Sequence, residues 1–141
     1  MIEYNNFVKN IRIDKIKLKK LLVDTIDNDE EISKKNVPLS VNLVYTANNY
    51  ELKDNKLCIN VNFSVETKDE CQNIVFKINF IYKIEYVLKN IKLSDVGEEN
   101  IENFININVP INIWPYAREI ISSITTRMGY SPLIIEPYTI G

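Results

Sequence analysis

Few side chains in this sequence have types and spacings that could carry out chemistry. Histidine is absent and only three glycines occur, which excludes Ser-His-Asp and Cys-His catalysis, nearly all zinc catalysis and phosphate-binding glycine loops. Two acidic clusters remain, Asp29-Glu30-Glu31 and Glu98-Glu99, and paired carboxylates can hydrolyse glycosides. Because both clusters stand in polar, loop-like contexts, solvated surface acids are favoured. The sequence therefore predicts no enzyme, no metal site and no cofactor.

Length and composition indicate a single globular domain. The chain has 141 residues, of which 45% are hydrophobic and 26% charged, so it can bury roughly two-thirds of its unfolded surface. A net charge of −2 argues against nucleic-acid binding. No signal peptide and no run of about 18 apolar residues is present, and Cys58 and Cys71 are too few for a disulfide scaffold. These features predict a soluble, cytoplasmic protein without membrane insertion.

The elements that would position any site begin with strands. In residues 8–18 the apolar positions change parity between Ile13 and Ile16, which predicts a bulge near Asp14-Lys15 if both sets face the core. A polar surface connection is expected over residues 24–38. Three further strands are marked by alternating apolar residues and separated by short turns, at 39–45, 57–65 and 74–88. This pattern is typical of an antiparallel meander with one face covered.

After residue 97 the apolar period changes from two to three or four. Pro115 suits the first turn of a helix and Gly129 its end, and residues 98–108 are interpreted as a shorter preceding helix. The apolar residues of the helix that ends at Gly129 fall on one stripe, which is predicted to contribute to the core and to a subunit interface. The predicted interface residues are Trp114, Ala117, Ile120, Ile121, Ile124 and Met128.

The prediction for the whole chain is a single α+β domain over residues 1–141. A four-stranded antiparallel sheet (7–90) is covered on its apolar face by a long C-terminal helix in the helical region 97–128. An extended segment (129–141) follows.

Residues 112–137 resemble the corresponding region of the SecB family of bacterial protein-export chaperones. Residues 114–119 read Trp-Pro-Tyr-Ala-Arg-Glu, which matches the family's aromatic-Pro-Tyr-Ala-Arg-Glu core. Arg127, a glycine and a Pro-x-Leu-x-x-x-Pro type linker at 132–137 follow, with the linker spacing shifted by about one residue. The order of bulged strand, polar connection, meander and late helix extends the resemblance over nearly the whole chain.

The resemblance implies an ATP-independent holdase, a dimer or dimer of dimers that holds unfolded, export-competent client polypeptides in hydrophobic grooves. The segment after the helix would help to wall such a groove, whereas packing of its side chains against the sheet is the alternative. The expected peptide-binding residues are Tyr130, Leu133, Ile135 and Tyr138, with Tyr45 and Phe76 of the sheet.

Two departures from the family bear on partners. The family's second helix has no counterpart before Gly141, which predicts a groove that is either more open or covered by the partner subunit. Members that deliver clients to the ATPase SecA carry acidic residues where this chain has Lys15, Lys19 and Lys77. Like charges repel, so a different or absent delivery partner is expected. The alternative is an adaptor, or a chaperone dedicated to a toxin–antitoxin pair, that binds one specific partner protein.

Overall fold

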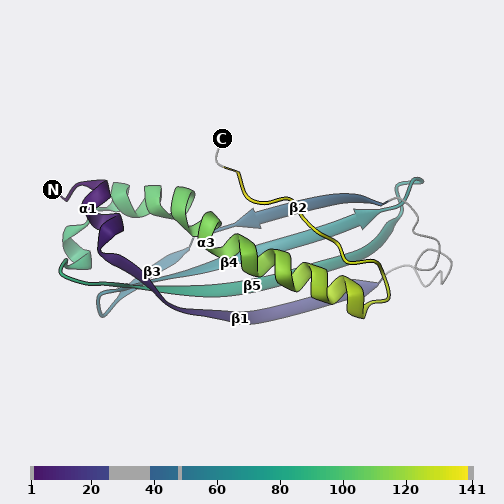
Figure 1. Cartoon of the computed structure of the whole chain (residues 1–141), viewed down its shortest axis with the longest axis horizontal. Helices are drawn as coiled ribbons and strands as arrows, with labels where there is room; N and C mark the ends of the chain where they lie inside the picture. The colour runs from purple at the N-terminus through teal and green to yellow at the C-terminus, as the bar shows by residue number, and fades with distance from the viewer. Residues whose placement is uncertain (1, 26–38, 48, 140–141) are drawn as a thin grey trace.

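The computed structural model describes residues 2–25, 39–47 and 49–139. The elements are α1 (Tyr4–Lys9), β1 (Ile11–Thr25), β2 (Ser40–Thr46), β3 (Tyr50–Lys53), β4 (Lys56–Lys68), β5 (Ile74–Leu88), the single-turn helix η1 (Leu93–Asp95) and α3 (Glu98–Arg127). The predicted α+β class, an antiparallel sheet with a long C-terminal helix, is confirmed (Figure 1). The acidic cluster at 29–31 and most of the polar connection predicted at 24–38 lie outside the described residues.

The strands form one antiparallel sheet in the order β1-β5-β4-β2, and β3 pairs with β4 next to β2. The predicted count of four strands was wrong, because residues 50–53, interpreted as part of a turn, form a fifth strand. The turn itself is shorter. Asp54 and Asn55 have φ angles of 52° and 61°, the left-handed pair that a tight two-residue hairpin requires.

Strand β1 contains two bulges. Its register with β5 shifts between Ile13 and Lys15, as predicted, and again between Leu18 and Lys20. Each extra residue changes the parity by one, so all paired apolar residues except Leu22 share the face of the even-numbered β5 residues. They are Ile11, Ile13, Ile16, Leu18, Leu21 and Val23. The second bulge was not predicted, since the run Leu21-Leu22-Val23 has no visible break in parity.

Helix α3 is continuous, whereas two successive helices were predicted. Pro110 and Pro115 lie inside it, and each removes one hydrogen bond to the carbonyl four residues earlier. Those carbonyls belong to Asn106 and Ile111, both exposed, so water can satisfy them. The helix bends near its middle (Figure 1), as internal prolines favour. It ends before Gly129, whose φ of 92° needs a residue without Cβ.

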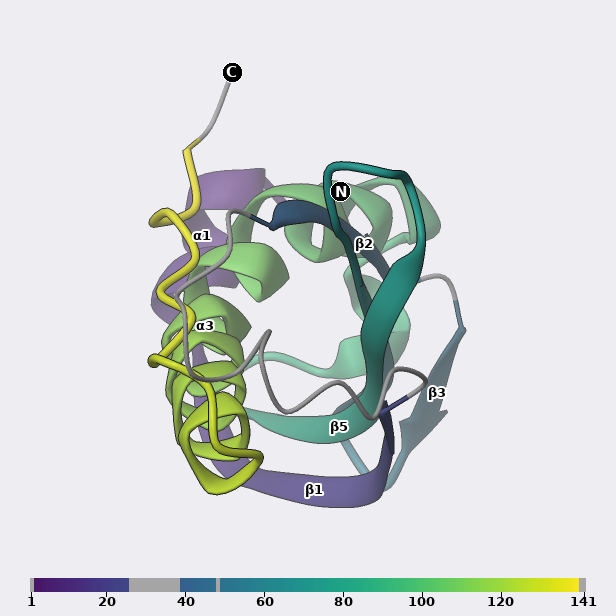
Figure 2. The ribbon, with the colours of Figure 1, turned by 90° about the vertical axis from the view of Figure 1, so that its right-hand side faces the viewer.

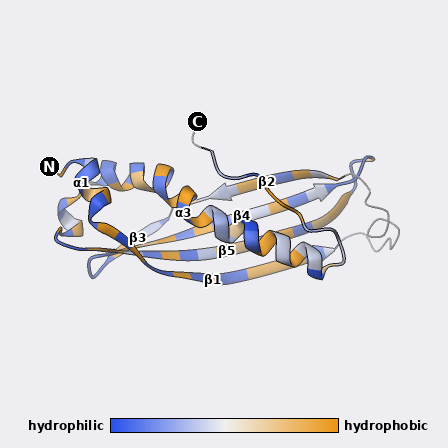
Figure 3. Ribbon diagram, viewed as in Figure 1, coloured by the Kyte–Doolittle hydropathy of each residue, from blue (hydrophilic) through white to orange (hydrophobic). Residues whose placement is uncertain are grey.

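The helix packs along the open side of a strongly curved sheet (Figure 2). Apolar and polar residues alternate along the strands (Figure 3), and the inward-facing set forms one core with the helix. Ala117 and Ile121 are fully buried and Ile120 is 7% exposed, so these members of the predicted stripe pack within their own chain. Trp114, Ile124 and Met128 are half-buried against the same core. The core part of the prediction for the stripe is thus confirmed, and its role in a subunit interface stays a prediction.

Residues 4–9 form helix α1, although the sheet was predicted to start at residue 7. Phe7 is completely buried, and its ring lies 5.4 Å from that of Phe104 in α3. The Tyr4 hydroxyl donates a 2.6 Å hydrogen bond to the Asn108 side chain. A buried aromatic contact to a distant helix therefore overrides the strand that the local sequence suggested. Within the described parts of the chain, no helix is long and apolar enough to cross a membrane.

Candidate peptide-binding groove

A groove of about 590 Å³ opens between strand β2, helix α3 and the segment that follows α3. Val41 and Leu43 line it from β2, Trp114 from α3, and residues 133–139 from the C-terminal segment. That segment turns back after α3 and runs between the helix and β2 (Figure 1). The groove thus has one wall of regular sheet and one wall of irregular chain.

Side chains of α3 hold the C-terminal segment in place. The Leu133 N–H donates to the Thr125 Oγ1 at 2.9 Å, the Arg118 Nε donates to the Ile135 carbonyl at 2.9 Å, and the Trp114 Nε1 donates to the Glu136 carbonyl at 2.6 Å. These three helix residues lie at steps of four and seven, so they share one face of α3. The segment is therefore attached by side chains rather than by a backbone ladder.

Replacing Thr125 by valine is expected to lower the free energy of unfolding by about 1–3 kcal/mol. Thr125 is fully buried and its hydroxyl donates to the Ile121 carbonyl at 2.8 Å, so valine leaves the Leu133 N–H without its partner. Urea unfolding followed by circular dichroism measures the change. The matched control is Thr126→Val, because Thr126 is exposed and its hydroxyl bonds only the Ser122 carbonyl of its own helix. Equal losses in both variants would contradict a role for Thr125 in holding the segment.

Aromatic rings form the inner end of the groove. The ring centroid of Trp114 lies 5.3 Å from that of Tyr138, 5.7 Å from that of Tyr45 and 5.8 Å from that of Phe63. Phe63 in turn stacks on Phe80 at 4.8 Å. Edge-to-face and offset rings at these distances attract one another beyond their buried area. The cluster therefore joins the end of the C-terminal segment to the sheet.

The groove is lined mainly by apolar side chains, together with Glu136 and Thr139, and the Tyr45 hydroxyl beside it is uncharged at neutral pH. Burial, together with the hydrogen bond and charge interaction that Tyr45 shares with Tyr138, raises the pKa of Tyr45 to about 12. A folded-state pKa above the ordinary value of 10.0 means that the neutral hydroxyl is favoured, and that this contribution to stability is lost as pH rises from 10.0 through about 12. The Tyr45 hydroxyl is therefore a neutral hydrogen-bonding group beside a mainly apolar surface.

Of the six predicted peptide-binding residues, Leu133, Ile135 and Tyr138 line the groove, whereas Tyr45, Phe76 and Tyr130 are not among its lining residues. Tyr130, Leu133, Tyr138 and Tyr45 are half-buried. Phe76 is 2% exposed and covered by the Tyr130 ring at 5.0 Å, and Ile135 is 7% exposed. The expectation that Ile135 would be partly exposed was wrong, because its side chain packs into the core.

The residues that the sequence interpretation missed are Ile134, Val41 and Leu43, together with Trp114, which had been assigned to the subunit interface. Ile134 is 62% exposed and lines the groove. Strand parity pointed to residues 133 and 135, but parity does not hold in an irregular segment bounded by prolines. Val41 and Leu43 follow the alternation of a strand, but nothing in the sequence indicates that they line a groove rather than lie under the helix.

The remaining polar side chains near the helix do not form a reaction centre. Arg118 bonds the C-terminal segment, as expected of a residue that anchors the helix to a neighbouring loop, while the exposed Glu119 lies on another face of α3. The second acidic pair, Glu98 and Glu99, occupies the first turn of α3, where carboxylates stabilise the helix dipole. Within the described residues no cluster of three potential metal ligands occurs.

The described residues thus form an α+β protein in which a curved antiparallel sheet packs against one long helix, beside a groove lined mainly by apolar side chains. The chain belongs to the SecB family: residues 5–139 match the family described as Preprotein translocase subunit SecB.

Known relatives agree with this assignment. The protein-export protein SecB of Methylobacillus flagellatus is 39% identical over 46 residues, which cover 33% of this chain and 29% of that protein. SecB of Wolbachia pipientis is 28% identical over 109 residues, covering 72% of this chain and 65% of that protein. The matched part thus spans less than two-thirds of either relative.

A solved structure shares the fold. The SecB-like chaperone Rv1957 of Mycobacterium tuberculosis, in complex with a peptide from the HigA1 antitoxin, has a TM-score of 0.80 at 14% identity. The comparison covers 95% of this chain and 94% of that one. At this identity the likeness concerns the fold.

Proposed function

We propose that this protein is an ATP-independent holdase chaperone of the cytoplasm that binds unfolded polypeptides in the groove between β2 and residues 133–139. The observation that carries the proposal is the groove itself, about 590 Å³ in volume and walled by Val41, Leu43, Trp114 and Ile134. An apolar surface of this kind suits clients of varied sequence, because burial contributes roughly 25 cal/mol per Å² whatever the order of the client's residues. Membership of the SecB family supports the same function.

The construction of the groove also suits varied clients. The irregular wall is attached to α3 by single hydrogen bonds, which Arg118 and Trp114 donate and the Thr125 hydroxyl accepts, so it can shift without breaking a strand or a helix. The aromatic residues supply rigid contact area at low cost in side-chain entropy. A client would bind by displacing water from Ile134 and its neighbours, with no need for nucleotide or metal.

We further propose that the chain acts as a homo-oligomer, a dimer or dimer of dimers. The exposed apolar side chains that favour this lie along β1 and α3 rather than in the predicted stripe. Ile13, Leu18 and Val23 are 46%, 45% and 38% exposed, and Ile107, Ile111 and Tyr116 are 41%, 43% and 44% exposed. The two sets are continuous, since the Tyr116 ring lies 6.1 Å from that of Tyr82, whose partner in β1 is Leu18. An exposed surface of this extent is typical of an interface.

A chaperone with one dedicated partner, such as an antitoxin, is the second candidate. It is favoured by the likeness of the fold to the SecB-like chaperone bound to an antitoxin peptide. A general holdase and a dedicated one differ in selectivity. A general holdase binds several unrelated unfolded proteins with similar affinity, whereas a dedicated chaperone, or an adaptor for a folded protein, leaves them to aggregate.

The experiment measures aggregation of a reduced, unfolded client at a stoichiometric ratio of the purified protein, without nucleotide. The double variant Ile134→Ser/Tyr138→Ser is expected to hold the client roughly ten- to hundredfold more weakly, since each apolar side chain contributes about 1.5–3 kcal/mol when fully buried. Its melting temperature should fall only modestly, because Ile134 is 62% exposed, while the half-buried Tyr138 loses its ring contacts with Trp114 and Tyr45.

The matched control is Leu52→Ser, an equally apolar and 47% exposed position on β3 that does not line the groove. It should hold the client as the unchanged protein does. Client holding that survives in a well-folded double variant would place the binding surface elsewhere. Wild-type protein that suppresses no aggregation of any unfolded client would overturn the general holdase.

A further inference from the structure

The face of the sheet that points away from α3, here called the outer face, carries a second hollow of about 400 Å³. It forms where short polar side chains, Asn62, Ser64 and Asn79, occupy the two central strands. Leu22 and Val44 flank them on β1 and β2 and are 49% and 50% exposed, and Ile81 closes one side. The hollow is therefore apolar at its rim and lies on the face opposite the groove.

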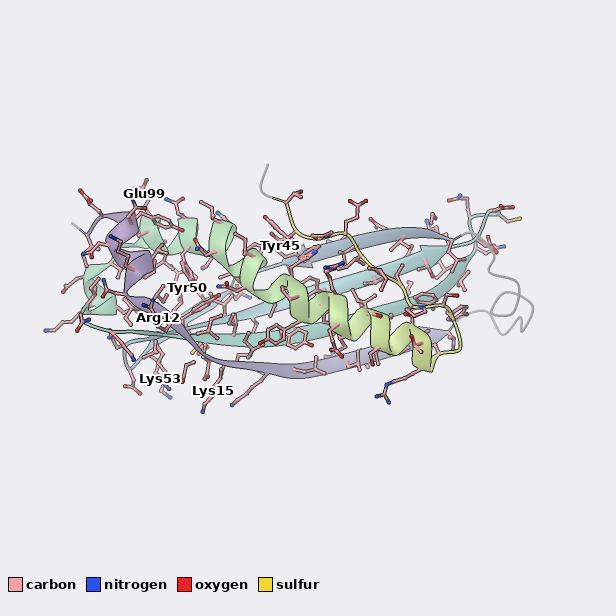
Figure 4. The ribbon with its side chains drawn as sticks, viewed as in Figure 1. Arg12, Lys15, Tyr45, Tyr50, Lys53 and Glu99 are labelled. Carbon is pink, nitrogen blue, oxygen red and sulfur yellow. The ribbon has the colours of Figure 1, made fainter. Side chains whose placement is uncertain are left out.

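Cations accumulate beside this hollow along β1. Lys20 lines it, and Lys15 and Lys17 follow on the same outer face, as their pairing with β5 places them. Lys19 stands in the second bulge between them. Across the described parts of the chain, none of these four lysines has a carboxylate within ion-pair distance. Figure 4 shows Lys15 and Lys53 projecting from the sheet away from the helix.

The carboxylates that face these lysines are already engaged by other cations. Asp14 pairs with Lys56 at 3.1 Å, and Glu85 pairs with Lys83 at 3.4 Å. Beyond the hollow, Glu66 lies 3.7 Å from both Lys68 and Lys77, and Asp24 is the neighbour of Lys77 in the register. At one side of the hollow the outer face therefore has an excess of positive charge, since Glu85 is shared electrostatically by Lys83, Lys17 and Lys15. At the other side the charge is balanced, although the whole chain has a net charge of −2.

We propose that the outer face docks a partner polypeptide through a segment that combines acidic and aliphatic residues. The aliphatic side chains would cover Leu22, Val44 and Ile81, and the carboxylates would meet Lys17 and Lys20. Opposite charges bring such a segment to the correct side of the hollow and exclude basic sequences. The docked partner leaves the groove between β2 and the C-terminal segment free, so the protein can hold a client and this partner at the same time.

The composition of the face favours a polypeptide over a nucleic acid. Single-stranded nucleic acids are held by aromatic side chains on which bases stack. Every aromatic residue of the described strands lies on the other face, as the register of β2, β4 and β5 requires. The outer face instead offers exposed aliphatic side chains, which contribute nothing to binding a phosphate backbone.

The test uses a fluorescein-labelled peptide in which leucine alternates with glutamate, a second peptide with lysine in place of glutamate, and a labelled oligouridine. Fluorescence anisotropy with the full chain should give the tightest binding for the glutamate peptide, weakening as ionic strength rises. Lys17→Glu/Lys20→Glu should weaken it by about tenfold or more, since two surface attractions become repulsions. Leu22→Ser/Val44→Ser should weaken it several-fold.

The matched control is Lys9→Glu/Lys92→Glu, which changes the net charge equally at exposed positions off the outer face. It should leave the affinity unchanged, as should Ile134→Ser/Tyr138→Ser in the groove. Thermal melting of each variant confirms that it is folded. Equal affinity for the two peptides, tighter binding of the oligouridine, or an equal effect of the two lysine double variants would overturn the proposal.

Discussion

Replacing Trp114 by alanine is expected to abolish client holding and to lower the free energy of unfolding by about 3 kcal/mol. The indole contacts the rings of Tyr45, Phe63 and Tyr138 and donates a hydrogen bond to the Glu136 carbonyl. Removing a large buried aromatic side chain costs about 3–5 kcal/mol, and the lower end applies because Trp114 is only half-buried. Without the ring, the C-terminal segment loses its contact with the sheet, and the groove loses the lining side chain that α3 contributes.

The control that separates the ring from its N–H is Trp114→Phe. Phenylalanine keeps aromatic contacts with Tyr45 and Tyr138 but leaves the Glu136 carbonyl without its donor, which costs about 1 kcal/mol. Client holding by this variant should persist at reduced affinity. Urea unfolding measures the stability of both variants, and suppression of client aggregation measures how well each variant holds a client. A Trp114→Ala protein that still held clients at wild-type affinity would show that the groove is not the client site.

The second large effect is expected on self-association. Leu18→Glu should yield a folded monomer, because Leu18 is 45% exposed in the single chain and an unpaired carboxylate in an apolar interface costs several kcal/mol. That cost corresponds to at least about a hundredfold weaker association. Light scattering measures the mass, and thermal melting shows whether the monomer is folded.

Two further variants complete this test. Leu52→Glu introduces the same charge at a 47% exposed leucine on β3 and should leave the oligomer intact. Ile124→Asp changes a half-buried residue that packs against the core of its own chain, so it should lower the melting temperature rather than merely separate subunits. A wild-type protein that is monomeric at micromolar concentration would refute the proposed oligomer.

Much of the fold could be predicted from local pattern. The parity change between Ile13 and Ile16 located the first bulge, and the unbroken alternation at 57–65 and 74–88 located the central strands. Both signals are reliable because a side chain in a strand can face only one of two sides. Helix α1 and strand β3 were missed. Helix α1 depends on the contact of Phe7 with the distant Phe104. Strand β3 pairs locally with β4 across the Asp54-Asn55 hairpin, but its short stretch lies among Asn and Asp residues that are typical of a turn.

The groove could be predicted only as a region. The motif at 114–119 and the apolar run at 133–135 pointed to the correct segment, and the structure brings Tyr138 to Tyr45 and Trp114. Which of the three consecutive apolar residues would be exposed could not be inferred. Outside a helix or strand no fixed period links neighbouring side chains. The hydrogen bonds that the Leu133 N–H donates to Thr125 and that Arg118 donates to the Ile135 carbonyl set the orientation of Leu133 and Ile135.

By itself, the sequence determined the class of protein and the absence of most catalytic chemistry. A chain without histidine cannot use a histidine base, and the periods of its apolar residues permit little other than a sheet and a long helix. Only the tertiary structure decided which apolar residues are covered. Ile121 and Ile135 are buried, while Leu18, Ile111 and Ile134 stay open to solvent. Exposure depends on how far one helix reaches across a curved sheet, which is a property of packing and not of any single segment.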